Sequence, residues 1–107
     1  MIRHIVLIRF RPDIPDDRAA DLLAPLGPLS HRLGFTATWG RSQSPEQIER
    51  GYLHGFVADF ADWSALAAYQ EDPEHKAFGA GLVAHAQGGI DGILVFDLAT
   101  GGAVSIT

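Results

Sequence analysis

The chain has 107 residues, of which 47% are hydrophobic and 20% are charged, and its formal net charge is −5. This composition indicates one globular domain and excludes a disordered chain. The acidic charge argues against nucleic acid or an anionic membrane as a partner. The absence of cysteine excludes disulfides, thiolate metal sites and a cysteine nucleophile. The sequence shows no leader pattern and no membrane-spanning pattern, so a cytoplasmic protein is expected.

Residues 2–11, IRHIVLIRFR, predict a first strand, because β-branched and aromatic residues are frequent there and Pro12 follows. Alternation places one set of side chains on one face: Ile2, His4, Val6, Ile8 and Phe10. The opposite face has Ile5 and Leu7 at its centre, so both faces are apolar at mid-strand. A chain of this length has too few helices to cover both faces, and a second copy of the sheet is the expected cover for one of them.

A helix is predicted over residues 13–33, with Asp13 or Asp16 as its N-cap. Pro25 and Pro28 should kink or split this helix. Its apolar stripe is formed by Ala19, Leu22, Leu23, Leu26 and Leu29.

Further strands are predicted at residues 35–41, 52–60 and 90–98. The polar loop after the first of these is expected to contain one helical turn at 45–49. The even positions of the second share a face: Tyr52, His54, Phe56, Ala58 and Phe60. Residues 103–106, AVSI, are compatible with a short edge strand.

Between these strands, two helices are predicted on either side of a proline break. Asp62 is the expected N-cap of the first. One face of it is shared by Trp63, Leu66, Ala67 and Gln70, flanked by Tyr69. Pro73 interrupts the helix, and Asp72 becomes the N-cap of a second helix that runs to about Ala86. Its inward stripe consists of His75, Phe78, Leu82 and His85.

The order strand, helix, strand, strand, helix, strand predicts an α+β, ferredoxin-like split βαβ fold with a four-stranded antiparallel sheet and helices on one face. Four segments resemble the stress-responsive α/β-barrel (Dabb) family: HIVLIRF, GYLHGFVADF, AYQEDPEH and ILVFDL. The resemblance implies a single domain over residues 1–99 with a tail at 100–107. It also implies a homodimer whose two open sheet faces close into a β-barrel. Asp72 stands where the family often has a histidine.

One enzymatic branch of the family resembles olivetolic acid cyclase, which acts by aldol condensation without a metal or cofactor. When the motifs are matched, the tyrosine and the histidines of that branch correspond to Tyr69, His75, His4 and His54 in this sequence. The resemblance therefore implies catalytic roles for His75 and Tyr69 and no cofactor. The pocket beside them is expected to include Phe56, Phe78 and Leu82.

The residues give their own reason to single out His75. As the third residue of a helix it lies at the positive end of the helix dipole, which favours the neutral imidazole. It also begins the apolar stripe, so it should point inward. A neutral imidazole beside an apolar pocket suits proton abstraction next to a carbonyl, and Tyr69 can donate a hydrogen bond to the developing enolate oxygen.

Other interpretations remain open from the sequence. His75 can instead cap the helix, and His4 and His54 can be core histidines with satisfied hydrogen bonds. No H-x-x-x-H or H-E-x-x-H pair is present, which argues against a zinc enzyme. The main hypothesis is a dimer with one apolar pocket per subunit for a small carbonyl-bearing or aromatic ligand. The alternatives are a non-enzymatic stress or stability protein that acts through assembly, and an antibiotic-biosynthesis-type monooxygenase, which shares the architecture.

Overall fold

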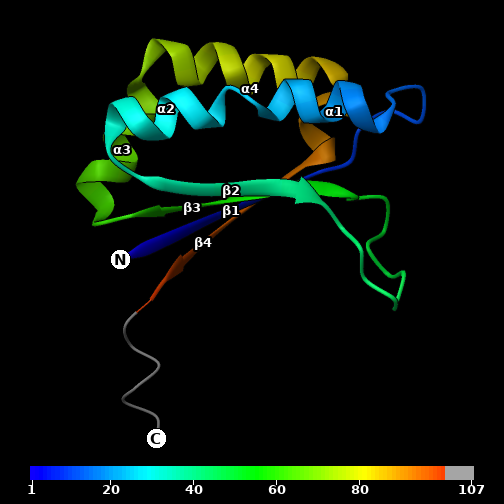
Figure 1. Cartoon of the computed structure of the whole chain (residues 1–107), viewed down its shortest axis with the longest axis horizontal. Helices are drawn as coiled ribbons and strands as arrows, with labels where there is room; N and C mark the ends of the chain where they lie inside the picture. Colours follow the sequence, from blue (N-terminus) through cyan, green and yellow to red (C-terminus); the bar gives the residue numbers. More distant parts are fainter. Residues whose placement is uncertain (101–107) are drawn as a thin grey trace, which may run out of the picture.

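Four strands form one antiparallel sheet in the order β2-β3-β1-β4 in the computed structural model, which describes residues 1–100 (Figure 1). The strands are β1 (Ile2–Ile8), β2 (Thr36–Arg41), β3 (His54–Phe60) and β4 (Ile93–Ala99). The helices are α1 (Asp16–Leu23), α2 (Leu26–Leu33), α3 (Trp63–Glu71) and α4 (Pro73–His85), with a 3-10 turn, η1, at Gly89–Gly92. The helices lie on one side of the sheet, which confirms the predicted ferredoxin-like α+β fold.

The two faces of the sheet differ in how far they are covered. On the side that faces the helices, here called the helix side, β1 and β3 bury every second residue. The buried side chains are Ile2, His4, Val6, Ile8, His54, Phe56, Ala58 and Phe60. The other side, here called the open face, has partly or fully exposed apolar side chains at Ile5, Leu7, Val57, Leu94, Phe96 and Leu98. The helices therefore cover one face only, as the sequence predicts.

Local signals set the helix boundaries largely as predicted. The Asp62 side chain accepts a hydrogen bond from the Ala65 backbone N–H and starts α3. The first predicted helix is split at Pro25: α1 ends at Leu23 and α2 begins at Leu26. The predicted aspartate cap of α1 is wrong, because Pro15 holds the N-cap position and no side chain caps the helix. Asp16 instead lies inside the first turn, where its charge suits the helix dipole.

The strand boundaries are shorter than predicted. β1 ends at Ile8, where its pairing with β3 ends, and the Arg9 backbone that follows bonds to Gly92 and Gln87. β3 begins two residues later than predicted, and β4 three residues later because η1 occupies the start of the expected strand. Residues 45–49 contain a turn but no helix. The expected edge strand at 103–106 lies outside the described residues.

The side chains predicted to share a face of α3 are not buried together. Three of them are exposed: Trp63, Ala67 and Gln70. The buried residues of α3 are Leu66 and Tyr69. The Tyr69 ring packs against Phe35 and Phe60, with ring centroids 5.1 and 5.0 Å away. These aromatic contacts fix the rotation of the short helix, which its weak apolar periodicity does not.

Candidate functional site

A cavity of about 260 Å³ lies between α4 and the helix side of the sheet. Five of the seven predicted site residues line it: His4, Phe56, His75, Phe78 and Leu82. The other lining residues are aliphatic or glycine except for Gln70. No lysine, arginine, aspartate or glutamate contributes to the wall. The cavity is therefore an uncharged, mainly apolar space with two imidazoles in its wall.

His75 is positioned by the proline break between α3 and α4. The Asp72 carboxylate accepts hydrogen bonds from the backbone N–H groups of Glu74 and His75, and Pro73 occupies the first helical position, as predicted. The His75 side chain is half-buried, and among the described residues its Nδ1 has no hydrogen-bond partner. Burial lowers the pKa of His75, although the backbone carbonyl of Gln70 opposes this shift. The imidazole is therefore neutral near pH 7.

Tyr69 lies against His75 but does not line the cavity. The two ring centroids are 3.9 Å apart, and Tyr69 is only 1% exposed. Its hydroxyl is buried and makes no hydrogen bond within the part of the chain that the structure describes. Burial raises the pKa of Tyr69, so the phenol stays protonated at neutral pH. An unpaired buried hydroxyl is costly, which makes Tyr69 a feature that packing alone does not explain.

The third polar contributor is His4 on β1, which Asp97 of β4 holds in place. The two residues are direct partners in the β1–β4 register, and His4 Nδ1 lies 2.5 Å from Asp97 Oδ1. Because an ionised carboxylate only accepts hydrogen bonds, His4 Nδ1 is the donor, and this fixes the ring orientation. The His4 ring centroid lies 5.9 Å from that of Tyr69. His4, Tyr69 and His75 thus form one cluster, here called the His–Tyr cluster.

The sequence prediction did not include Asp97. Its signal was present, because strand alternation places Asp97 on the same face as Ile93 and Val95, as a lone carboxylate among apolar residues. Only the register of β4 against β1 reveals that this carboxylate lies opposite His4.

His54 lies outside this cavity. It is the first residue of β3, at the end of the sheet near the start of α1, and its Nε2 is 3.3 Å from Asp16 Oδ1. Its ring packs edge-on against Phe10, with centroids 5.4 Å apart. Burial lowers the pKa of His54, and the Asp16 carboxylate opposes this shift. The structure thus separates His54 from the two histidines with which it was grouped.

The family model for the stress responsive A/B barrel domain (Dabb) matches residues 2–99 of this chain. The chain belongs to the Dabb family. A dimeric ferredoxin-like protein of unknown function from Jannaschia sp. CCS1 is 36% identical to this Dabb protein, with a TM-score of 0.84, and the match covers 92% of this chain and 98% of that one. The resemblance found in the sequence is thereby confirmed.

Two further proteins are similar to this chain. The stress-response A/B barrel domain-containing protein HS1 of Arabidopsis thaliana is 26% identical over 98 residues, which are 90% of this chain and 86% of that protein. A hydroxynitrile lyase from Passiflora edulis is 19% identical with a TM-score of 0.77, and the match covers 91% of this chain and 90% of the lyase. At that identity the likeness concerns the fold alone.

Within residues 1–100 of the Dabb protein, no three histidine, aspartate or glutamate side chains are grouped so that they could hold a metal ion. None of the described helices is long and apolar enough to cross a membrane. What the described residues do bring together is a neutral imidazole, a protonated phenol and a carboxylate-held imidazole beside an uncharged cavity. These groups are suited to moving a proton on a small neutral molecule.

Proposed function

We propose that this Dabb protein binds a small uncharged molecule with a carbonyl group or aromatic ring in the α4 cavity, and acts on it by acid–base chemistry without a cofactor, as a cyclase, lyase or isomerase. One observation carries this proposal. The neutral His75 imidazole lies in the wall of an apolar cavity and packs against the ring of Tyr69, whose buried hydroxyl has no partner among the described residues. Buried polar groups without partners are uncommon in protein cores and are tolerated where they serve a ligand.

The cavity wall limits the ligand in charge and size. A carboxylate or phosphate placed there would lose its hydration without meeting any lysine or arginine. The volume of about 260 Å³ lies just below the range of roughly 300–1,000 Å³ that is typical of sites for drug-sized ligands. The aromatic side chains of Phe56 and Phe78 suit an apolar or aromatic body, and the imidazoles suit one polar group.

The roles within the His–Tyr cluster follow from its protonation states. His75 is the base, because its lowered pKa leaves a lone pair available at neutral pH. The Tyr69 ring packs against His75 behind the cavity wall and holds the base in position. Its raised pKa keeps its hydroxyl protonated, so it can donate a proton to a ligand oxygen that reaches past His75. The Asp97 carboxylate orients His4, which presents its other ring nitrogen as a second polar group of the cavity.

We also propose that the protein is a homodimer through its open face. The relative from Jannaschia, at 36% identity, is described as dimeric and ferredoxin-like. The open face of this chain has the apolar character that such an interface needs, with Leu94, Phe96 and Leu98 each more than 40% exposed. A monomer would leave this surface in water.

The second candidate function is a non-enzymatic stress protein that acts through assembly. The name of the Arabidopsis relative favours it. A protein that acts only through assembly has no use for an unpaired buried hydroxyl, whereas a catalytic site does. The two candidates therefore differ in whether the His–Tyr cluster has a chemical effect on a ligand.

The test is exchange of the methyl protons of acetophenone with deuterium, followed by proton NMR in heavy water. Acetophenone is a small neutral aryl ketone, and exchange requires only removal and return of a proton next to its carbonyl. The wild type should exchange these protons faster than buffer, and His75→Gln should reduce the rate by about 100-fold or more. His85→Gln is the matched control, because His85 lies on the same helix with its Nδ1 2.7 Å from the Gly81 carbonyl oxygen. An exchange rate that is the same in wild type and His75→Gln would refute the catalytic proposal.

A further inference from the structure

The edge strand β4 has exposed apolar side chains on both of its faces. Phe96 on the open face and Val95 on the helix side are both 55% exposed. Ile90 of η1, beside β4 on the helix side, is 67% exposed. Figure 1 shows β4 running away from the helical layer rather than beneath it. An exposed apolar edge strand is a ready site for association with another chain, so a surface must be available to cover it.

Building on the dimer and the cavity proposed above, we infer that the cavity is completed by the partner subunit: the β2 edge of the partner closes its mouth, and the partner's Trp39 forms the missing wall. The cavity wall includes Ile90, Ile93 and Val95. These residues place its mouth at the β4 edge. A partner that covered only the open face would leave Val95 and Ile90 in water, so the partner must reach around this edge to the helix side.

The open face itself selects β2 as the strand that meets β4. Its β4 half carries the large side chains Leu94, Phe96 and Leu98. Its β2–β3 half contains a hollow of about 320 Å³ where Gly40 pairs with Gly55. Gly55 cannot be larger, because a Cβ there would lie 2.7 Å from the Val6 carbonyl oxygen.

If the two-fold axis of the dimer is parallel to the strands, the β4 half of each open face, with its large side chains, packs on the β2–β3 half of the partner, which contains the hollow. If the axis is instead perpendicular to the strands and in the plane of the sheet, the two β4 halves pack on each other and the two hollows face each other. The first arrangement packs the interface densely, as stable interfaces require. It also places β4 of each subunit along β2 of its partner.

Strand direction agrees with this arrangement. β1 is antiparallel to both β3 and β4, and β2 is antiparallel to β3, so β2 and β4 run in opposite directions. An axis parallel to the strands preserves their directions, and β4 therefore lies antiparallel to the partner's β2. The two edges can extend the antiparallel ladder across the subunit boundary.

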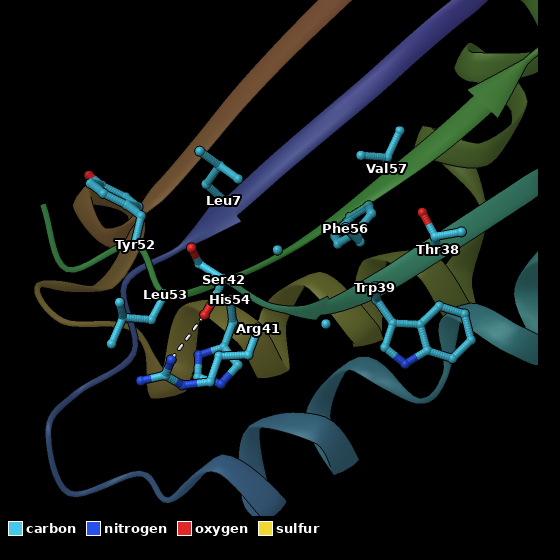
Figure 2. Close-up of a pocket in the computed structure, with 12 residues that line it drawn as sticks. Leu7, Thr38, Trp39, Arg41, Ser42, Tyr52, Leu53, His54, Phe56 and Val57 are labelled. Carbon is cyan, nitrogen blue, oxygen red and sulfur yellow. Dashed lines mark hydrogen bonds between the residues drawn. The ribbon is translucent and has the colours of Figure 1, made fainter. Parts of the chain in front are cut away.

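Trp39 is the side chain that this arrangement brings to the mouth of the cavity. It lies on the helix side of β2 and is 41% exposed. Across the sheet it pairs with Phe56, which pairs with Val6, which in turn pairs with Val95. Figure 2 shows Trp39 on the side of the sheet opposite to Leu7 and Val57. The exposed apolar residues on the helix side of the two edges, Trp39 on β2 and Val95 on β4, thus cover each other between subunits.

Within one subunit, Trp39 cannot reach a ligand at Val95. β2 and β4 are separated by β3 and β1, and three strand spacings amount to about 14 Å. Trp39 is, however, the direct neighbour of Phe56, which also lines the cavity, so only a loss of emission that disappears in a monomeric variant reports the partner's tryptophan. The chain has only two tryptophans, so a Trp63→Phe background leaves Trp39 as the single fluorophore.

The experiment titrates acetophenone into the Trp63→Phe protein and into two further variants made in the same background, Thr38→Arg and Gly40→Arg. Both substitutions place a charged side chain in the hollow half of the open face, away from the cavity, and no atom lies within 4 Å of a Cβ built at Gly40. Light scattering gives the mass, circular dichroism confirms folding, and tryptophan emission and the NMR signals of His75 report binding. The expected result is a dimer whose Trp39 emission falls at least twofold on saturation. The arginine variants should be folded monomers that bind about tenfold more weakly without any change in emission.

Several outcomes overturn the inference, and they are distinguishable. Folded monomers that bind acetophenone as tightly as the dimer would show that the cavity is complete in one subunit. A dimer that binds acetophenone without quenching Trp39 would show that another part of the partner covers the mouth. A wild-type mass of one chain would overturn the proposed dimer as well, and a wild-type dimer without a His75 response would overturn the proposed cavity function.

Discussion

Replacing Tyr69 by phenylalanine should make the protein more stable. The ring packing of Tyr69 against Phe35, Phe60 and His75 is retained in Tyr69→Phe, whereas the buried hydroxyl without a hydrogen-bond partner is removed. Leaving such a group unsatisfied costs about 1–3 kcal/mol. Removal of one oxygen leaves a small void that offsets part of this gain. The expected net effect is a free energy of unfolding raised by about 1 kcal/mol, or a Tm raised by roughly 4–8 °C.

The assay is urea and thermal unfolding at one fixed protein concentration, because dimerisation makes Tm concentration-dependent. Tyr52→Phe is the matched control, since Tyr52 is the other tyrosine of the chain and its hydroxyl donates to the Asp91 carbonyl oxygen at 3.3 Å. Loss of that exposed bond should lower stability by at most about 1 kcal/mol. The two variants should therefore shift stability in opposite directions.

Destabilisation of Tyr69→Phe by about 1 kcal/mol or more would refute this reasoning. It would show that the Tyr69 hydroxyl forms a stabilising hydrogen bond in the native protein. In that case the hydroxyl would be part of the structural core rather than a group held ready for a ligand.

Three further predictions follow from the cluster and its supports. Burial lowers the pKa of His75, so the wild type should lose stability relative to His75→Gln between about pH 7 and pH 5 in urea unfolding, because the unfolded imidazole takes up a proton that the folded one resists; a wild type that gains stability relative to His75→Gln over this range would contradict this. Chiefly through its hydrogen bond with Arg32, the pKa of Asp72 falls to about 2, so Asp72→Ala should lower Tm by several degrees at pH 7 and by progressively less as the pH falls from about 4 towards 2; a loss independent of pH would speak against the charged cap. Asp97→Asn should slow deuterium exchange of acetophenone by about tenfold or more and change the nitrogen-15 shifts of the His4 imidazole. The dimer mass from light scattering should stay the same. Unchanged nitrogen-15 shifts would show that Asp97 does not set the orientation of His4.

The fold was predictable from the sequence because its signals are local. Alternation in β1 and β3, the aspartate cap at Asp62, and the Asp72–Pro73 break each act within a few residues, and the structure confirms them. The strand ends were not predictable in the same way. β1 stops at Ile8, where its pairing with β3 ends at His54, and no local pattern encodes where a distant partner strand ends.

The site residues were predictable one by one, but the contacts between distant elements were not. His75 and Phe78 follow from the helical spacing of α4, and both line the cavity. Asp97 needed the register of β4 against β1, a contact between residues 93 positions apart. His54 was grouped with His4 by the family resemblance, but the antiparallel register places His54 opposite Ile8, at the other end of β1.

The most direct test of the proposed function is the position of bound acetophenone, measured by isotope-filtered NOEs or by a crystal structure of the complex. The proposal predicts that the ketone lies in the α4 cavity, with its ring against Phe78 and its carbonyl end beside His75, and that benzoate of similar shape does not bind there because the wall has no cation. Acetophenone found in the hollow of the open face or beside His54, with the α4 cavity empty at saturation, would contradict it.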